Sequence, residues 1–230
     1  MIRDSGSSQR LESHLRLLVV TDAASAAPRS VMEVVREALD GGCRAIQLRD
    51  KVGPARETLA LARELRALTR SRDALLFIND RVDLALAVGA DGVHLGPADL
   101  PLSCARHWAG RFLALGYSTD DPEEARQAVA QGADYLGCGA VFGTRTKDVG
   151  SEAIGVERLN RVAHAVPVPV LAIGGIDETN VDQVARTEAA GVAVVRAVMA
   201  APDPREATRR LLERLGHPAP AGGSGPAPED

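Results

Sequence analysis

The chain has no long apolar run: no stretch approaches the roughly 20 residues that a membrane-spanning helix needs. Its first residues also lack the apolar core of a secretory signal peptide. Both absences argue against a membrane partner, and we expect a cytoplasmic protein.

Cysteine, aromatic residues and excess charge are also scarce. The three cysteines, Cys43, Cys104 and Cys138, are an odd number without zinc-ligand spacing, which predicts reduced, buried thiols. Only 3% of the residues are aromatic, and the formal net charge is −4. Without a basic excess, nothing in the composition favours nucleic acid or an anionic membrane as a partner.

What the chain does contain is a regular alternation of apolar strand patterns and amphipathic helix patterns. Strands are expected over residues 15–20, 44–48, 75–78, 92–95, 112–115, 135–137, 168–173 and 192–195. Helices are expected over residues 30–39, 54–69, 81–87, 102–109, 122–130, 156–165, 178–186 and 205–215. Such an alternation predicts an α/β fold, a single-domain parallel (β/α)₈ TIM barrel.

The domain boundaries follow from composition. Residues 1–13 are polar and unpatterned and are expected to be a flexible tail, residues 14–216 to be the barrel, and the Pro/Gly/Ala-rich residues 217–230 to be disordered. An open doubly wound sheet is the alternative fold. Its glycine signature is missing, because Gly137, Gly139 and Gly143 have the wrong spacing.

A weak internal echo supports the barrel. The tripeptide Gly-Ala-Asp ends at Asp91 and again at Asp134, and Ala190-Gly191 precedes the last strand. Turns of this kind join the end of a helix to the next strand.

Two carboxylates follow neighbouring expected strands, Asp80 after the third strand and Asp99 shortly after the fourth. Either residue alone could serve local structure, Asp80 as a helix cap and Asp99 in the turn before Pro101. Together, at the same end of adjacent parallel strands, they favour a Mg²⁺ site, because Mg²⁺ is usually held by one or two carboxylates plus substrate phosphates.

The second strand ends in a polar run, Gln47-Leu48-Arg49-Asp50-Lys51. Side chains alternate along a strand, so if Leu48 faces the helices, Gln47 and Arg49 face the barrel axis. Polar groups in a barrel interior suggest a ligand, and the Arg49 guanidinium suits phosphate oxygens. A surface charge cluster is the alternative.

Other strand ends carry further candidates. Ser118 could donate to a phosphate, whereas Asp120 is expected to cap the next helix. The hydroxyl- and cation-rich loop of residues 144–147 could close over a charged substrate, and a solvated loop is the alternative. Gly174 and Arg196 follow the seventh and eighth strands, where barrels commonly bind phosphate. His94 is expected to be a packed barrel residue.

At these positions the sequence resembles the thiamine-phosphate synthase family over roughly residues 15–215. The matching motifs are QLRDK (47–51), INDRVD (78–83), GADGVHLGPADLP (89–101), GYST (116–119), TRTK (144–147), AIGGI (172–176) and VVRAV (194–198). The resemblance implies an enzyme that condenses hydroxymethylpyrimidine diphosphate with hydroxyethylthiazole phosphate, giving thiamine phosphate and diphosphate through a pyrimidine-methyl cation.

The resemblance also implies residue roles, two small-molecule substrates and a Mg²⁺ cofactor; a homodimer and a monomer both stay open. The implied pyrimidine-diphosphate ligands are Gln47, Arg49, Lys51, Asn79, Ser118 and Lys147, with Arg49, Lys51, Ser118 and Lys147 acting in catalysis. The implied Mg²⁺ ligands are Asp80 and Asp99, and the implied thiazole-phosphate site is Thr144, Thr146, Gly174, Val195 and Arg196. Leu48, Asp50 and Arg145, within the same motifs, complete the substrate-binding set.

Two departures from the family pattern keep alternatives open. Many relatives have His where this chain has Asp120, and Pro where it has Ala140 and Gly143. We expect Asp120 to face away from the diphosphate, because a further carboxylate there would be repulsive. The alternatives are a thiazole tautomerase-like barrel enzyme, whose relatives use the His that Asp120 replaces, and a non-catalytic phosphate-binding paralogue.

Overall fold

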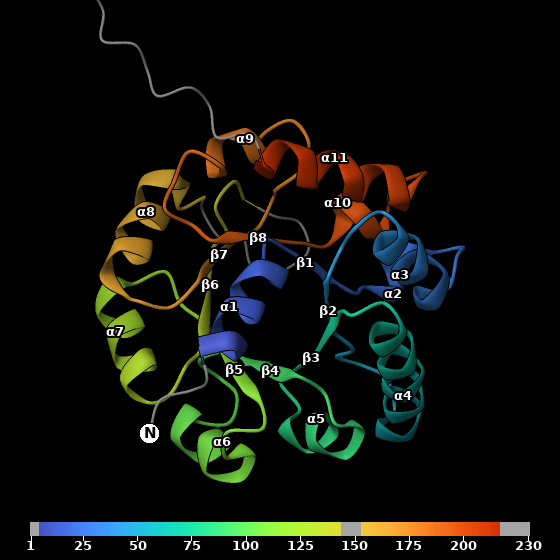
Figure 1. Cartoon of the computed structure of the whole chain (residues 1–230), viewed down its shortest axis with the longest axis horizontal. Helices are drawn as coiled ribbons and strands as arrows, with labels where there is room; N and C mark the ends of the chain where they lie inside the picture. Colours follow the sequence, from blue (N-terminus) through green and yellow to red (C-terminus); the bar gives the residue numbers. More distant parts are fainter. Residues whose placement is uncertain (1–4, 144–152, 217–230) are drawn as a thin grey trace, which may run out of the picture.

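The computed structural model describes residues 5–143 and 153–216, which form a closed barrel of eight parallel strands ringed by helices (Figure 1). The strands are β1 (Leu17–Val20), β2 (Ala45–Leu48), β3 (Leu75–Asn79), β4 (Gly92–Leu95), β5 (Ala114–Ser118), β6 (Tyr135–Cys138), β7 (Val170–Ile173) and β8 (Gly191–Val194). The helices are α1 (Ser5–His14), α2 (Ala23–Ala26), α3 (Val31–Asp40), α4 (Ala55–Ser71), α5 (Val82–Val88), α6 (Leu102–Ala109), α7 (Pro122–Ala130), α8 (Gly155–Ala165), α9 (Val181–Val184), α10 (Arg196–Met199) and α11 (Pro204–Gly216). The predicted TIM barrel is confirmed.

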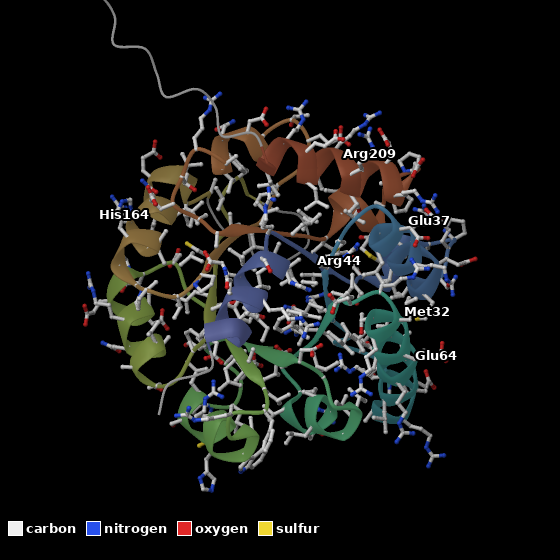
Figure 2. The ribbon with its side chains drawn as sticks, viewed as in Figure 1. Met32, Glu37, Arg44, Glu64, His164 and Arg209 are labelled. Carbon is white, nitrogen blue, oxygen red and sulfur yellow. The ribbon has the colours of Figure 1, made fainter. Side chains whose placement is uncertain are left out.

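Alternation along the strands divides the apolar residues between two cores. Side chains such as Val19, Ile46 and Leu76 pack outward against the helices in the larger core, whereas Leu18, Val20 and their neighbours fill the barrel interior. The outer faces of the helices carry exposed charged and polar groups such as Glu64, His164 and Arg209 (Figure 2). This two-core arrangement is what a (β/α)₈ barrel requires.

The expected flexible tail of residues 1–13 contains helix α1, which corrects the expectation for residues 5–13, whereas residues 1–4 lie outside the described residues. Helix α1 crosses one end of the barrel (Figure 1), and Leu11, only 9% exposed, joins the interior core. Arg10 forms an ion pair with Asp73 just before β3, and the His14 ring bonds to the Asp73 carbonyl. Because Asp73 precedes its strand, α1 closes the N-terminal end and leaves the opposite end for a site. The expected tail of residues 217–230 lies outside the described residues.

Two other expected elements are shifted. The strand predicted over residues 112–115 begins later, at Ala114 in β5. The Phe112 amide bonds to the Ala109 carbonyl in the turn after α6, and Phe112 is 90% exposed. The expected helix 178–186 shortens to α9, because Asp177 holds a turn by accepting from the Thr179 amide and hydroxyl. Apolar and polar patterns alone do not reveal either turn.

The repeated Gly-Ala-Asp motif is explained by the contacts of its aspartates at the N-terminal end of the barrel. The Asp91 carboxylate accepts from the Leu76 amide at 2.8 Å and pairs with Arg66 of α4 at 2.5 Å. The Asp134 carboxylate does the same with the Leu115 amide at 2.7 Å and Arg106 of α6 at 2.6 Å. Each aspartate thus ties the start of one strand to the preceding strand and to an outer helix. Ala190 keeps only the backbone bond, from its amide to the Val170 carbonyl.

Three rings, those of Phe77, His94 and Tyr135, lie in the barrel interior. The Phe77 and Tyr135 rings meet edge-on, with centroids 5.3 Å apart, and the His94 ring lies 5.4 Å from Tyr135. Glycines make the room for them: a Cβ on Gly92 would lie 2.6 Å from the Phe77 ring, and one on Gly116 would collide with Tyr135 and His94. The rings are therefore held in place from several sides.

The cysteine prediction holds in part. All three thiols are free, and Cys43 and Cys138 are buried, whereas Cys104 is exposed on α6, which corrects that expectation. Burial raises the pKa of Cys43 to about 11 and that of Cys138 to about 12, so both stay protonated. No helix among the described residues has the length and apolarity to cross a bilayer.

Candidate functional site

A cavity of about 950 Å³ opens at the C-terminal end of the barrel. All eight strands or the residues that follow them contribute to its lining, from Leu18 and Val20 of β1 to Val194 of β8. In (β/α)₈ barrels this end carries the active site, because the loops that vary between proteins converge there. The cavity is therefore the candidate site.

The cavity brings together most of the residues that the sequence singled out. Its lining includes Gln47, Arg49, Lys51, Asn79, Asp80, Asp99, Ser118, Gly174, Val195 and Arg196. Thr144, Arg145, Thr146 and Lys147 lie outside the described residues.

Two predicted substrate ligands are placed elsewhere. Leu48 is 2% exposed and packs in the outer core, as the alternation along β2 requires. The Asp50 carboxylate accepts from the Thr58 hydroxyl at 2.8 Å and from the Gly53 amide at 2.8 Å, and these bonds hold its pKa below the usual range. Asp50 therefore fixes the loop into α4, and its side chain faces that loop instead of the cavity.

Asp80 and Asp99 face each other across neighbouring strand ends. Removal from water raises the pKa of Asp99, and the adjacent Asp80 carboxylate raises it further, whereas the Gly96 amide, 2.7 Å from Oδ2, opposes the rise. Lys51 Nζ lies 3.0 Å from Asp80 Oδ2 and offsets part of the negative charge. Two neighbouring carboxylates, one of which has a raised pKa, fit a divalent cation, whose charge would offset the repulsion between them.

The backbone of Asp80 is unusual. Its φ is +63°, in the left-handed region that only Gly, Asn and Asp adopt readily. Its amide bonds to the His94 carbonyl of β4, which holds this conformation. Helix α5 begins after Arg81 and has no side-chain cap, so Asp80 is not the helix cap considered from the sequence. Strained backbone at a polar cavity is typical of a functional residue.

Two arginines at the cavity have no acidic partner within the described part of the chain. Among residues 5–143 and 153–216, no carboxylate lies within ion-pair distance of Arg49 or Arg196. Arg49 follows β2, where its backbone amide bonds to the buried Thr21 hydroxyl at 3.0 Å, and Arg196 follows β8. Unpaired guanidinium groups at a cavity are suited to phosphate.

The loops after β6 and β7 pack backbone to backbone at the rim. The Val141 amide bonds to the Ile173 carbonyl at 2.9 Å, and the Phe142 amide to the Gly174 carbonyl at 3.1 Å. Gly174 has a φ of +98°, and an added Cβ would lie 2.6 Å from Ala140. Only glycine satisfies both the conformation and this close approach.

Gly174→Ala should therefore destabilise the protein more than Gly143→Ala does. Gly143 also has a positive φ, +74°, but an added Cβ would meet nothing within 4 Å. We expect a loss of about 1–2 kcal/mol for Gly143→Ala from conformation alone, and about 1–3 kcal/mol more for Gly174→Ala from overpacking. Urea unfolding of the two variants measures both, and equal losses would show that the β6 and β7 loops do not constrain each other.

Asp120 differs from its expected role as a helix cap. Asp121 caps α7, accepting from the Glu123 and Glu124 amides, each at 2.9 Å. The Asp120 carboxylate lies 3.6 Å from Arg158 of α8. Among the described residues that line the cavity, Asp120 is absent. The ion pair with Arg158 holds the Asp120 carboxylate toward α8, so Asp120 faces away from the cavity, as expected from the sequence.

His94 and Tyr135 are functional candidates that the sequence analysis missed. Both line the cavity, and His94, expected only to pack, bonds through Nε2 to the Ser118 hydroxyl at 2.8 Å and through Nδ1 to the Tyr135 hydroxyl at 3.1 Å. The alternation within GVHL could have signalled an inward His94, because Val93 and Leu95 face the helices.

Taken together, the closed parallel barrel, the acidic pair and the unpaired arginines define a phosphate-handling (β/α)₈ enzyme. The chain belongs to the thiamine monophosphate synthase family, whose model matches residues 17–198.

Individual relatives agree over nearly the whole barrel. The chain is 48% identical over 201 residues to a thiamine-phosphate synthase of Pyrococcus furiosus, covering 87% of this chain and 95% of that protein. It is 46% identical over 204 residues to a thiamine-phosphate synthase of Natronomonas pharaonis, covering 88% of this chain and 95% of that protein. The solved structure of thiamine phosphate pyrophosphorylase from Pyrococcus furiosus superposes with a TM-score of 0.82 at 46% identity, covering 90% of this chain and 98% of that one.

Proposed function

We propose that this protein is a thiamine-phosphate synthase, joining hydroxymethylpyrimidine diphosphate to hydroxyethylthiazole phosphate. One observation carries the proposal: a single cavity holds the Asp80–Asp99 pair after β3 and β4, and Gly174 and Arg196 after β7 and β8. In a ring of eight strands, β3 and β4 lie opposite β7 and β8. One cavity can thus hold a metal-bound diphosphate on one side and a phosphate on the other.

The diphosphate half would lie along β2 to β5. Gln47 and Asn79 supply neutral polar groups, and Arg49, Lys51 and Ser118 supply donors for the diphosphate oxygens. Lys147 is proposed for the same group, but it lies outside the described residues. Asp80 and Asp99 would hold Mg²⁺, which when bound neutralises charge on the diphosphate.

The thiazole-phosphate half would lie at β7 and β8. The glycine backbone at Gly174 allows close approach of a phosphate, Val195 begins the turn into α10, and Arg196 adds the charge. Thr144 and Thr146 are proposed ligands of the same phosphate and also lie outside the described residues.

The reaction follows from these roles. The bond between the pyrimidine methylene carbon and the diphosphate oxygen breaks, and its electron pair leaves with the diphosphate. Arg49 and Lys51 stabilise the charge that grows on that oxygen, and Ser118 can donate a hydrogen bond to it. The thiazole nitrogen then gives its lone pair to the methylene cation, forming the new carbon–nitrogen bond. Holding the nitrogen in line removes most of the entropic cost of this second step.

The test is formation of thiamine phosphate from the two purified substrates, with and without a chelator. We expect turnover that disappears in excess chelator and returns when Mg²⁺ is added back. No product under any metal condition would refute the proposal. The oligomeric state, monomer or homodimer, is measured on the same preparation by analytical ultracentrifugation.

Asp120→Asn separates this activity from that of a thiazole tautomerase. Asp120 pairs with Arg158 outside the cavity, so we expect condensation to change by less than about twofold, as for an exposed ion pair. The measurement is the initial rate of thiamine phosphate formation, beside an isomerisation assay on the thiazole substrate. Rapid isomerisation without condensation, lost in Asp120→Asn, would support the tautomerase instead.

A further inference from the structure

Three side chains from three strands form a line of hydrogen bonds across the barrel interior. The Tyr135 hydroxyl of β6 lies 3.1 Å from His94 Nδ1 of β4, and His94 Nε2 lies 2.8 Å from Ser118 Oγ of β5. Tyr135 is fully buried, whereas Ser118 faces the cavity. The line therefore joins the barrel core to a group that can touch a ligand.

The chemistry of Tyr135 sets the direction of these bonds. A phenol is protonated at neutral pH, and burial raises the pKa of Tyr135 further, so its hydroxyl carries a proton that needs an acceptor. Gln47 also bonds to this hydroxyl and lowers its pKa, as an amide that donates to the phenol oxygen does, so the phenol proton is left for His94 Nδ1 at 3.1 Å. A neutral imidazole that accepts at Nδ1 carries its own proton at Nε2, and so donates to Ser118 Oγ.

The opposite tautomer would have a different consequence at the cavity. If Nδ1 were protonated, Nε2 would accept the Ser118 proton, and the serine would offer only lone pairs to a ligand. With Nε2 protonated, Ser118 accepts from His94 and keeps its own proton free to donate. Only this second arrangement suits an anionic ligand.

We propose that His94 is a positioning residue, which together with Tyr135 aims the Ser118 hydroxyl proton at the diphosphate leaving group. This inference rests on the proposed function, because it assigns Ser118 to the pyrimidine diphosphate. The diphosphate gains charge as it departs, so a donor fixed before the substrate binds costs no reorganisation in the transition state.

The packing around the rings supports a fixed arrangement. A Cβ on Gly116 would collide with both Tyr135 and His94, and one on Gly137 would lie 3.2 Å from His94 Cε1. Phe77 holds the other edge of Tyr135. The imidazole thus packs closely against the backbone of β5 and β6, at Gly116 and Gly137.

A double-mutant cycle in the assay for thiamine phosphate tests the positioning. We expect Ser118→Ala to lower kcat about 100-fold, as for the loss of one transition-state donor. We expect His94→Phe to lower kcat about tenfold or more, with little change in KM for the thiazole substrate. Added to Ser118→Ala, His94→Phe should have no further effect, because it acts through Ser118. His94→Gln, whose amide can still donate, should recover part of the loss, and the exposed His107→Phe is the control. Independent, multiplying losses would overturn the proposal.

A second measurement, of the His94 tautomer, does not depend on enzyme activity. In ¹⁵N-histidine-labelled protein, the NMR signal of His94 is assigned as the one that disappears in His94→Phe. We expect its ¹⁵N chemical shifts to show the Nε2-protonated tautomer. Tyr135→Phe should weaken that preference while the protein stays folded. An Nδ1-protonated His94 would overturn the inference, even if the wild type forms thiamine phosphate. Lack of product with the expected tautomer would instead refute the proposed function, and with it the assignment of Ser118 to a diphosphate.

Discussion

Replacing Asp80 with asparagine is expected to lower kcat about 100- to 1,000-fold, the range for removing one electrostatic group that stabilises a transition state. Asparagine keeps the size of the side chain and tolerates the φ of +63° at this position, so the fold should be retained. It removes one of the two carboxylates proposed to hold Mg²⁺. The measurement is the initial rate of thiamine phosphate formation over a range of Mg²⁺ concentrations.

Asp83→Asn is the matched control for this change. Asp83 is three positions further along, on the exposed face of α5, and pairs with Arg81. We expect it to retain wild-type turnover and an unchanged Mg²⁺ requirement. If Asp80→Asn behaved in the same way, the acidic pair would not be the metal site.

Replacing Arg49 with alanine should lower kcat about 100-fold or more while leaving KM for the thiazole substrate nearly unchanged. The reason is that Arg49, unpaired among the described residues, is assigned to the diphosphate, whose charge is greatest in the transition state. Steady-state kinetics with each substrate varied in turn separates the two parameters.

Arg56→Ala is the control here, because Arg56 is exposed on α4, and it should alter neither parameter. A rise in the thiazole KM as the main effect of Arg49→Ala would mean that the two halves of the cavity are assigned to the wrong substrates. Arg196→Ala, on the β8 side, would then be expected to lower kcat instead.

The barrel could be predicted from the sequence because its signals are local and repeated. Each strand is a short apolar run that is followed by an amphipathic helix, and the boundaries of β4, α6 and α7 agree with the expected residues. Helix α1 could not be found in this way, because its stability comes from Leu11 entering the barrel and from Arg10 and His14 meeting Asp73, which is distant in sequence. Contacts across such a distance leave no periodic pattern.

The site was predictable to a similar degree. Residues that follow the strands, such as Asp80 and Arg49, could be placed at one end by topology alone, because all strands of a barrel end on the same side. Asp50 shares a motif with Arg49, yet the turn that it stabilises through Thr58 directs it elsewhere. The contact of His94 with Tyr135 and Ser118 joins three strands, and it becomes visible only when the barrel is closed.

The glycines that make room for the interior rings also limit which substitutions this barrel can accept. Alanine at Gly116 cannot be accepted while Tyr135 and His94 keep their places, and alanine at Gly92 meets Phe77 in the same way. A smaller residue at position 135 would remove only one of the two collisions at Gly116, because His94 would still be in the way, and it would also remove the hydroxyl that bonds to His94. These positions are therefore coupled: a larger residue at Gly116 needs both rings to move, and one at Gly92 meets the Ala114 carbonyl as well as Phe77, so neither glycine can be replaced by changing a single ring.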